Sequence, residues 1–539
     1  MNLFIVESPT KAKTIQKYLG KGWVVKATLG HIKDLPEDEL GVDEETLQPK
    51  FVWVKGKKKL MEELKKLSAK AKEVYIGTDP DREGEAIAYF VYKELSKEKA
   101  KLHRAVFYEI TPESIKSAIK NAGTINMNLV YAQFARRVLD RLIGYKLSPH
   151  LWRAFGQRNL SVGRVQSPAL RLIVEREREI ESFRKKEYYY IKVVFEKDGI
   201  EFSALWDYRF EKPSNAEPFV GKLKNALFEV QRVERKRDKK EPPKPFITAS
   251  LQATANQLLR LSVDQIQRIA QKLYEEGYIT YPRTDSYRMN EKKAKEFIAY
   301  IRENYGENYA GRLRSFKTRQ TAQGAHECIR PTSLKKPLLH GTELALYELI
   351  LARTLASLST PAEFLNTRAL IKPICPEKGC EGITLVAKGR ELLFEGYLRF
   401  YPEDVELAKL PELKEGQILK PKKITLEKRQ TQPPPRYTEG TLVKKLEELG
   451  IGRPSTYATI VKTLKSRGYV FEEKGYLRPT DIAFLVVDYL REFMPKVVDY
   501  GFTSYMEEEL DLVEEGKQDW KSTVKKLFQG VLKDGGLTE

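Results

Sequence analysis

The sequence of 539 residues is poor in cysteine and histidine and has no long apolar run. Only three cysteines are present, which is typical of proteins kept in a reducing compartment. No apolar stretch approaches the roughly 20 residues that cross a bilayer. The N-terminal apolar run at residues 3–6 is also too short for a signal peptide. We therefore expect a cytoplasmic protein with no membrane partner.

Two common ligand-binding motifs are missing as well. No Gly-x4-Gly-Lys-Ser/Thr phosphate loop occurs, so we expect no use of ATP through that motif. Cys375 and Cys380 are close in sequence, but no second Cys pair or His pair follows to complete a zinc site. We therefore expect no zinc site. The two cysteines could instead form a local disulfide.

What the sequence has in excess is positive charge. There are 95 Lys and Arg against 75 Asp and Glu, which gives a net charge of +20. This excess favours a polyanionic partner, above all nucleic acid, through counterion release and electrostatic steering. A basic surface that is merely solvated is the alternative. Charged residues make up 32%, more than in an average domain, which points weakly to the ion-pair networks of a thermophile.

The chain is too long for a single core, so we expect several domains. The first 120 or so residues alternate between strands and helices, which predicts a small α/β domain on a mostly parallel sheet. Glu7 and Asp79 would lie at the carboxyl ends of its strands, where such sheets bind ligands. The expected strands are residues 3–6, 73–77 and 104–109, and the expected helices are residues 11–19, 83–94 and 114–120.

The rest of the chain predicts helical segments around a β-rich part. A β-hairpin with its turn at Asp198-Gly199 is expected, and later β segments flank a helical insert. The expected elements are basic helices at 128–144 and 168–180 with an irregular 152–166 between them, strands at 188–195 and 200–206, a linker at 235–245, helices in 248–356, β structure in 364–425, and helices with one short hairpin in 437–539.

Tyr281 and Arg283 stand two residues apart in the non-helical segment 278–286, Tyr-Ile-Thr-Tyr-Pro-Arg-Thr-Asp-Ser. A tyrosine hydroxyl, with an ordinary pKa of about 10, can attack a phosphodiester only where the site supplies positive charge and a partner for the leaving oxygen. This pairing suits such an attack. For the segment alone, a buried strand end with an aromatic core residue is an equal alternative.

Asp79, Asp81 and Glu83 follow one another at i, i+2 and i+4 where a strand passes into a helix. Hard oxygen ligands at this spacing can share one Mg2+. Acids at a helix start also complement the helix dipole, which is the alternative. Because the acids begin before the helix and stand opposite Glu7, we favour the metal site.

Glu7 together with Asp79-x-Asp81-x-Glu83 resembles the Toprim domain of type IA and type II topoisomerases, bacterial primases and some nucleases. Further motifs distinguish among these protein families. In their order along the chain, they resemble a type IA DNA topoisomerase over nearly its whole length. The motifs are residues 7–14 (ESPTKAKT), 28–36 (TLGHIKDLP), 136–141 (RRVLDR), 161–167 (SVGRVQS), 279–286 (ITYPRTDS), 325–331 (AHECIRP) and 450–457 (GIGRPSTY).

The resemblance implies a toroidal protein with α/β and α+β parts in four domains. They are a Toprim domain at 1–125, of which about 36–60 is a candidate for packing on the gate domain; a helical single-strand-binding or gate domain at 126–183 and 430–539; a β-rich arch or hinge domain at 184–245 and 360–429; and a helical domain at 246–359 that carries Tyr281. Hinged movement near 235–245 and 364 would open the gate.

The resemblance also implies ATP-independent, Mg2+-dependent relaxation of negatively supercoiled DNA by strand cleavage, strand passage and religation. Tyr281 would form a 5′-phosphotyrosine, with Arg283 and Lys11 on the phosphate. Glu7 would be a proton donor or metal ligand, and Asp79, Asp81 and Glu83 metal ligands. His326 matches a family histidine that orients phosphate or relays a proton, although an ordinary hydrogen-bonded histidine is the alternative.

Further residues match family positions along a groove for single-stranded DNA, where basic side chains track phosphates and aromatic rings stack on bases. Core packing is the alternative for Tyr145 and Trp152, and Tyr278 is expected to pack. The matching residues are His31, Arg136, Arg137, Asp140, Tyr145, Trp152, Ser161, Val162, Gly163, Arg164, Val165, Gln166, Arg283, Arg453, Ser455 and Thr456.

The chain departs from the bacterial topoisomerase I pattern in two places. It ends at Glu539 without Cys-rich zinc ribbons, and Pro282 is more like topoisomerase III or reverse gyrase. Decatenation in the manner of topoisomerase III is therefore an alternative activity. A Toprim nuclease or primase and a non-catalytic single-strand binder are alternatives of other classes. The resemblance suggests a monomer that acts on the DNA of the nucleoid.

Overall fold

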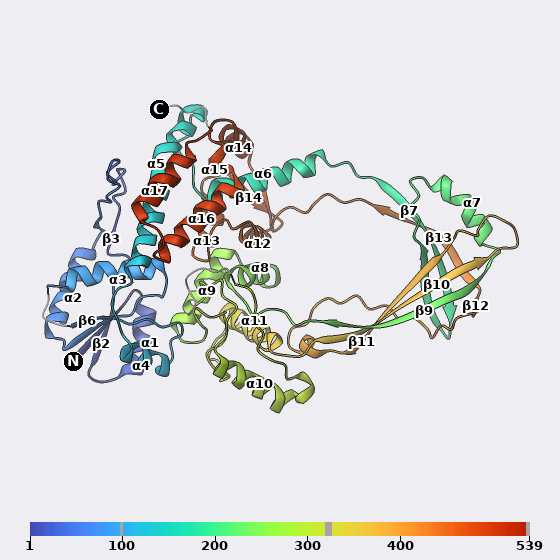
Figure 1. The fold of residues 1–539 in the computed structure, drawn as a ribbon, viewed down its shortest axis with the longest axis horizontal. Coiled ribbons are helices and arrows are strands. Elements are labelled where there is room, and N and C mark those ends of the chain that lie inside the picture. The colour runs from blue at the N-terminus through green and yellow to red at the C-terminus, as the bar shows by residue number, and fades with distance from the viewer. Residues whose placement is uncertain (98–100, 319–325, 535–539) are drawn as a thin grey trace.

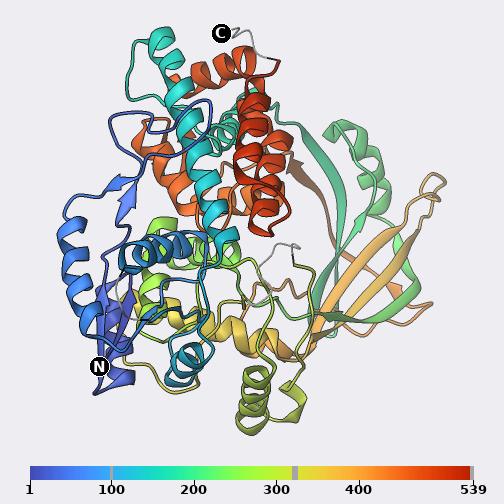
Figure 2. The ribbon, with the colours of Figure 1, turned by 60° about the vertical axis from the view of Figure 1, so that its left-hand side comes forward.

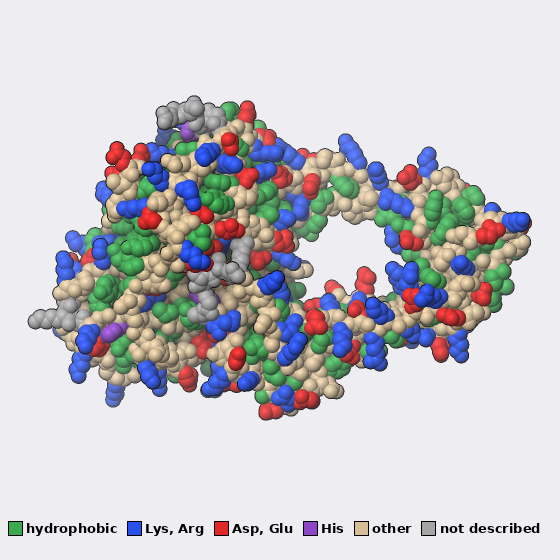
Figure 3. Space-filling view, viewed as in Figure 1, with side chains coloured by type: hydrophobic (Ala, Val, Ile, Leu, Met, Phe, Trp, Pro, Cys, Tyr) green, Lys and Arg blue, Asp and Glu red, His purple; other side chains and the backbone are tan. Residues whose placement is uncertain are grey.

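The computed structural model describes residues 1–97, 101–318 and 326–534. A body of helices and one small sheet is joined by two arms to a curled sheet, which we call the arch (Figure 1). Side chains leave an open hole between the body and the arch, with Lys, Arg and acidic side chains around its rim (Figure 3). The predicted multidomain toroid is confirmed.

The N-terminal sheet contains four parallel strands in the order β2-β1-β5-β6. The strands are β1 (Asn2–Val6), β2 (Trp23–Ala27), β5 (Glu73–Ile76) and β6 (Lys101–Arg104). Helices α2 (Lys57–Lys70) and α3 (Arg82–Leu95) cover one face, and α1 (Pro9–Leu19) and α4 (Pro112–Lys120) cover the other. Leu3 and Ile5 pack toward α2 and α3, whereas Phe4 and Val6 pack toward α1 and α4. Burial on both faces explains the continuous apolar run of β1.

One strand prediction for this sheet is wrong, and two elements were not predicted at all. The third strand was predicted at 104–109 but is β6, at residues 101–104. This polar strand pairs with β5 only up to Arg104. The apolar residues after it are buried beyond the sheet, and the carbonyl of Tyr108 accepts a hydrogen bond from the backbone N–H of Tyr281 at 2.9 Å. Strand β2 and helix α2 were missed.

Above the small sheet lies a set of packed helices, which we call the gate helices (Figure 2). They are α5 (Met127–Phe155), α6 (Gln166–Ser182), α12 (Glu439–Leu449), α13 (Tyr457–Ser466), α14 (Asp481–Phe493), α15 (Pro495–Val498), α16 (Tyr500–Glu514) and α17 (Trp520–Val531), with the hairpin of β14 (Val470–Glu473) and β15 (Tyr476–Pro479). Helix α5 continues through Pro149 and includes Trp152, so its predicted end at 144 is wrong. Buried Leu147 and Leu151 on either side of Pro149 hold this turn in place. The predicted helix end at 535–539 lies outside the described residues.

A short excursion from the N-terminal domain reaches the gate helices. It contains the paired strands β3 (Lys33–Asp34) and β4 (Val52–Trp53). Arg141 on α5 donates to the carbonyls of Pro36 and Glu39 at 2.6 and 2.7 Å. The rings of Phe51 and Phe134 lie 4.9 Å apart. This segment therefore packs directly on α5.

The arch is a seven-stranded sheet in the order β12-β9-β10-β11-β8-β7-β13, flanked by helix α7 (Pro213–Leu223). Its strands are β7 (Glu187–Lys197), β8 (Ile200–Trp206), β9 (Leu227–Lys240), β10 (Ala362–Ile374), β11 (Leu385–Phe394), β12 (Ile418–Leu419) and β13 (Pro421–Gln430). The predicted hairpin at Asp198-Gly199 is confirmed by the antiparallel pairing of β7 with β8.

The predicted linkers at 235–245 and near Phe364 are wrong for the most part. Residues 235–240 belong to β9, and Phe364 is buried within β10. The two strands pair from Lys240 with Ala362 to Leu227 with Ile374. A strand exposed on both faces has no apolar period, so its charged residues were taken for a linker.

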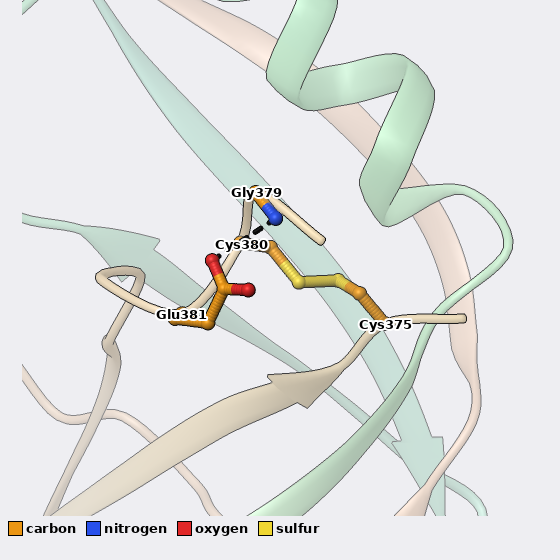
Figure 4. Close-up of a disulfide and its surroundings, with 4 residues drawn as sticks. All are labelled: Cys375, Gly379, Cys380 and Glu381. Carbon is orange, nitrogen blue, oxygen red and sulfur yellow. Dashed lines mark hydrogen bonds between the residues drawn. A yellow bond between two sulfur atoms is a disulfide. The ribbon is translucent and has the colours of Figure 1, made fainter. Parts of the chain in front are cut away.

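Cys375 and Cys380 form a disulfide at the end of β10, with their Cα atoms 6.4 Å apart (Figure 4). The Gly379 N–H donates to the Glu381 carboxylate at 3.0 Å within the same turn. The two cysteines therefore close the turn between β10 and β11. Among the described residues, no helix is long and apolar enough to cross a membrane.

The remaining domain lies below the gate helices and contains the Tyr281 segment. Its elements are α8 (Thr248–Leu259), α9 (Val263–Glu275), α10 (Glu291–Tyr305), α11 (Gly341–Ser357) and the short 3-10 turns η1 (Glu307–Tyr309) and η2 (Gly396–Arg399), the last of which leads out of β11. Tyr281 lies in the irregular stretch between α9 and α10, so the predicted helical insert is confirmed and the tyrosine segment is not a helix.

Candidate active site

The Tyr281 segment is fixed on both sides by its backbone. The N–H of Thr280 donates to the carbonyl of Arg330 in the same domain, and the N–H of Tyr281 donates to the carbonyl of Tyr108 in the N-terminal domain, each at 2.9 Å. The phenol is only 2% exposed. Tyr281 is thus held against the carboxyl end of the parallel sheet.

The hydroxyl of Tyr281 donates a hydrogen bond to Asp81. Asp81 is also the N-cap of α3, since its other oxygen accepts from the Gly84 N–H at 2.7 Å. Gly84 is required here, because a Cβ would lie 2.0 Å from the Asp79 carbonyl oxygen. Burial raises the pKa of Tyr281 well above its ordinary value; Arg283 opposes this shift, whereas Asp81 adds to it. The phenol is therefore protonated in this arrangement.

Arg283 bridges the three carboxylates that follow strand β5. Its guanidinium nitrogens lie 3.2 Å from oxygens of Asp79, Asp81 and Glu83. Its carbon Cζ is 5.6 Å from the centre of the Tyr281 ring. Although burial lowers the pKa of Arg283, these acids raise it well above its ordinary value. The structure brings together the tyrosine, the arginine and the acids that the sequence singled out.

Lys11, Glu7 and Asp79 form a buried charged group at the start of α1. The Nζ of Lys11 lies 2.6 Å from Glu7 Oε1 and 2.8 Å from Asp79 Oδ1, and the Asp79 N–H donates to Glu7 Oε2 at 2.7 Å. Burial, aided by the charge of Asp79 and opposed by Lys11, raises the pKa of Glu7 to about 7. Burial also raises the pKa of Asp79, but Lys11 and Arg283 bring it below its ordinary value. Glu7 is the one of these acids that holds a proton near neutral pH.

Glu83 contacts His31 as well as Arg283. His31 Nε2 lies 3.0 Å from Glu83 Oε1. This hydrogen bond lowers the pKa of Glu83 against the effect of burial. The pKa of His31 is raised in turn, because Glu83 outweighs the burial of the ring. The raised pKa favours the protonated, positively charged form of His31 at the open side of the acids.

The acids offer hard oxygen donors of the kind that Mg2+ prefers. Among the described residues, however, no group of three or more His, Cys, Asp or Glu side chains is arranged to hold a metal ion. The oxygens of Asp79, Asp81 and Glu83 are instead bonded to Lys11, Arg283 and other donors. The donor set fits Mg2+ in its chemistry, provided that Arg283 moves aside.

His326 is buried beside the Tyr281 ring, with the ring centres 5.9 Å apart. Its Nε2 lies 2.9 Å from the carbonyl oxygen of Pro80, so Nε2 carries the hydrogen. Its Nδ1 has no hydrogen-bond partner among the described atoms. Burial lowers the pKa of His326, which leaves the ring neutral. Ala325, the first residue of this predicted motif, lies outside the described residues.

The predicted DNA-contacting residues divide into buried and exposed ones. Val162, Arg164 and Val165 are buried, and Arg164 is paired with Asp140 at 2.7 Å and with Glu507. Ser161, Gly163 and Gln166 in the same stretch are half-buried. The side chains of Val162, Arg164 and Val165 face the core of the gate helices. They would contact DNA only after a change of structure.

Other predicted residues lie at the surface of α5. Tyr145 is 49% exposed, and Trp152 is 37% exposed, with its indole N–H donating to the Leu160 carbonyl at 2.7 Å. Core packing therefore does not explain Tyr145. Arg137 lies 2.9 Å from Asp34. Tyr278 packs against Tyr347, as expected, with ring centres 6.3 Å apart.

Arg136, Arg453 and Ser455 meet next to the acids. Arg136 Nη1 donates to Ser455 Oγ at 3.0 Å, and the Thr456 hydroxyl accepts from the Arg453 N–H at 2.9 Å. They adjoin a cavity of about 60 Å³. The cavity is lined by Asp81, Arg82, Arg136, Arg283, Thr284, Asp285, Arg453, Pro454, Ser455, Asp511 and Glu514.

Sequence reasoning missed a group of polar residues on α9. Gln271 donates to Asp79 at 3.1 Å, Glu275 accepts from the Ser8 hydroxyl, and the Tyr274 ring packs edge-on against Tyr281 at 5.1 Å. Their i, i+3, i+4 spacing on a helix just before Tyr281 was the available signal. It also missed Arg82 and its acidic partners on α16.

Comparisons with known proteins agree with this geometry. Residues 2–110 match the Toprim domain family, and residues 124–525 match the DNA topoisomerase family. The chain is 60% identical over 532 residues to DNA topoisomerase 1 of Aquifex aeolicus strain VF5, covering 98% of each chain.

A solved structure agrees as well. Full-length topoisomerase I from Thermotoga maritima, in a monoclinic crystal form, superposes with a TM-score of 0.88 at 39% identity, covering 98% of this chain and 90% of that one. The predicted resemblance is confirmed, and these matches do not favour topoisomerase III, a nuclease or a primase. The chain therefore belongs to the type IA DNA topoisomerases and is a bacterial topoisomerase I.

Proposed function

We propose that this topoisomerase relaxes negatively supercoiled DNA through transient cleavage of one strand by Tyr281, with Mg2+ and without ATP. One observation carries the proposal: across the contact between two domains, the Tyr281 hydroxyl bonds to Asp81, while Arg283 lies among Asp79, Asp81 and Glu83. A nucleophile, positive charge and acids therefore converge where a phosphodiester can enter.

In the cleavage step, the Tyr281 oxygen attacks phosphorus and the bond from phosphorus to the 3′ oxygen breaks. Asp81 is placed to accept the phenol proton, because it already accepts the hydrogen bond from that hydroxyl. Glu7 donates a proton to the leaving 3′ oxygen, which its pKa of about 7 allows. The 5′-phosphotyrosine conserves the energy of the broken ester, so religation by the 3′-hydroxyl needs no ATP.

Positive charge on the phosphate comes from two side chains. Arg283 is already beside the phenol, and Lys11 lies buried between Glu7 and Asp79. Both stabilise the negative charge that grows on the phosphate oxygens in the transition state. His326 packs against the Tyr281 ring and the Pro80 carbonyl, and it orients these groups.

Asp79, Asp81, Glu83 and Glu7 are the residues that would hold Mg2+. The ion supplies further positive charge at the phosphate when it is bound. On this chain, Arg283 gives up its contacts with the acids and turns to the phosphate as the strand enters.

We infer that the substrate strand runs past Tyr145 and Trp152 to the arginines next to the cavity, together with the other predicted contacts. The buried position of Tyr281 requires a single strand, because a duplex is too wide to reach it. Movement of the domain at 246–359 away from the Toprim domain opens the gate. We propose a monomer that acts in the cytoplasm on nucleoid DNA.

The test is to incubate a supercoiled plasmid with the protein and Mg2+, without ATP, and to trap covalent DNA adducts with denaturant. We expect relaxation and an adduct for the parent protein and neither for Tyr281→Phe. Tyr278→Phe is the matched control, because Tyr278 packs against Tyr347 nearby. Cutting of DNA by Tyr281→Phe would instead indicate a nuclease.

A further inference from the structure

Helix α16 carries three buried carboxylates on the face that meets Arg82, Arg164 and Arg453. Glu507, Asp511 and Glu514 are spaced at i, i+4 and i+7 and are 2%, 6% and 6% exposed. Carboxylates are rarely buried without positive partners, because the loss of hydration is costly. The proposed cleavage steps use none of the three.

The partners of this acidic row are arginines from three distant segments. Arg82 Nη2 lies 2.5 Å from Asp511 Oδ1 and 2.8 Å from Glu514 Oε2. Arg453 Nη2 lies 2.8 Å from the other oxygen of Asp511, and Arg164 contacts Glu507. Asp511 therefore binds one arginine with each oxygen and joins the Toprim domain to the 450–457 motif.

Arg82 stands between two residues of the candidate active site. It opens α3, directly after Asp81 and directly before Glu83. Since α16 holds its guanidinium, the first turn of α3 has a fixed place relative to the gate helices. Asp81 contacts Tyr281 and Glu83 contacts Arg283 from this turn. Asp511 can thus influence both catalytic contacts without touching them.

The same network borders the cavity beside Asp81. Arg136 lines this cavity and has no ion pair among the residues that the structure describes; its donors go to Ser455 and Gln133. Burial, together with the charges of Arg82 and Arg164, lowers the pKa of Arg136 to about 10, although Asp140 and Glu83 oppose this shift. A phosphate entering the cavity would meet the guanidinium of Arg136 together with Arg82 and Arg453, whose directions Asp511 fixes.

We propose that Asp511 is a positioning residue for strand cleavage. By holding Arg82 and Arg453, it keeps the start of α3 and the arginines around the cavity in one arrangement while the strand is cut. The inference rests on the proposed cleavage by Tyr281.

The test uses the full chain and a labelled single-stranded oligonucleotide, and it measures the rate constant and amplitude of covalent adduct formation in a single turnover. Asp511→Asn keeps the size of the side chain and removes its charge. We expect its rate constant to fall about 10- to 100-fold at a nearly full amplitude, as for a small misplacement of reacting groups. Asp511→Glu, which restores the charge, should recover part of the rate.

Asp488→Asn is the matched control, because Asp488 forms an ion pair with Arg178, with both oxygens bonded at 2.7 Å, on the surface of α14. This variant should cleave at the parent rate. A parent rate constant in Asp511→Asn overturns the inference, and so does a loss confined to amplitude and thermal stability, which indicates a structural role. If Asp511→Asn does not fold, Asp511→Glu decides: a slower rate supports the inference and an unchanged rate overturns it. Absence of any adduct in the parent protein would refute the proposed function instead.

Discussion

The ammonium nitrogen of Lys11 lies 2.6 Å from the Oε1 of Glu7, and the Lys11 side chain has no exposed surface. Although this contact favours the ionised acid, burial and the charge of Asp79 outweigh it and raise the pKa of Glu7 to about 7. Glu7 therefore carries a proton below about pH 7 and loses it as the pH rises through that value.

From this, we expect the single-turnover cleavage rate without added metal to fall above about pH 7, by about tenfold per pH unit, because the proton donor is lost. Glu7→Gln should be slow and should lack this slope. Rates measured between pH 5.5 and 9 check the prediction. Glu94→Gln, at a distant pair with Lys33, is the control and should keep the parent profile. A slope that persists in Glu7→Gln would assign the titration to another group.

Arg283 occupies the oxygens that a metal ion would need, at 3.2 Å from Asp79, Asp81 and Glu83. We expect Arg283→Ala to bind Mg2+ at least about tenfold more tightly in the absence of DNA, since a competing positive charge is removed. Calorimetric titration measures the affinity. The same variant should lose cleavage. Arg178→Ala, far from the acids, should bind Mg2+ like the parent protein, and an equal affinity in all three proteins would show that Arg283 does not compete.

Tyr145 offers an exposed ring on α5, 49% accessible, in the proposed path of the DNA strand. We expect Tyr145→Ala to weaken binding of a single-stranded oligonucleotide by about 1–3 kcal/mol, the usual contribution of one stacked base. Fluorescence anisotropy in the Tyr281→Phe background avoids cleavage during the measurement. Tyr208→Ala removes a similarly exposed tyrosine from the arch and should have little effect. Equal losses for the two variants would place the strand elsewhere.

The disulfide between Cys375 and Cys380 closes a short turn of the arch, with a sequence separation of 5. Its loss should destabilise the arch by about 2 kcal/mol, because so short a loop restricts the unfolded chain only modestly. Thermal unfolding with and without a thiol reductant measures this. The double variant Cys375→Ser, Cys380→Ser should match the reduced protein and should not respond to the reductant. Identical unfolding of the oxidised and reduced parent would contradict the prediction.

Much of the N-terminal sheet and the contacts of Tyr281 could be predicted from the sequence. Strand β1 is apolar on both faces. The spacing of Asp79, Asp81 and Glu83 at the end of a strand predicts a cluster of acids. The contact of Tyr281 with Asp81 joins residues 200 positions apart. It was expected only because the motifs resembled a family in which these parts meet.

The arms and the acidic row of α16 could not be predicted, for a common reason. The charged end of β9 has neither the alternation of a half-buried strand nor a turn signal, and its conformation comes from pairing with β10. Glu507, Asp511 and Glu514 look like the solvated side of a helix. They are buried only because Arg164, Arg453 and Arg82 converge on them from elsewhere in the chain.

Neither arm of the ring is a single strand: one pairs β7 with β13, and the other pairs β10 with β9 on one side and with β11 on the other (Figure 1). Hydrogen-bonded strands bend and twist as a unit, whereas a single unpaired segment can change its conformation residue by residue. Separation of Tyr281 from the acids would therefore require the paired strands of both arms to bend together.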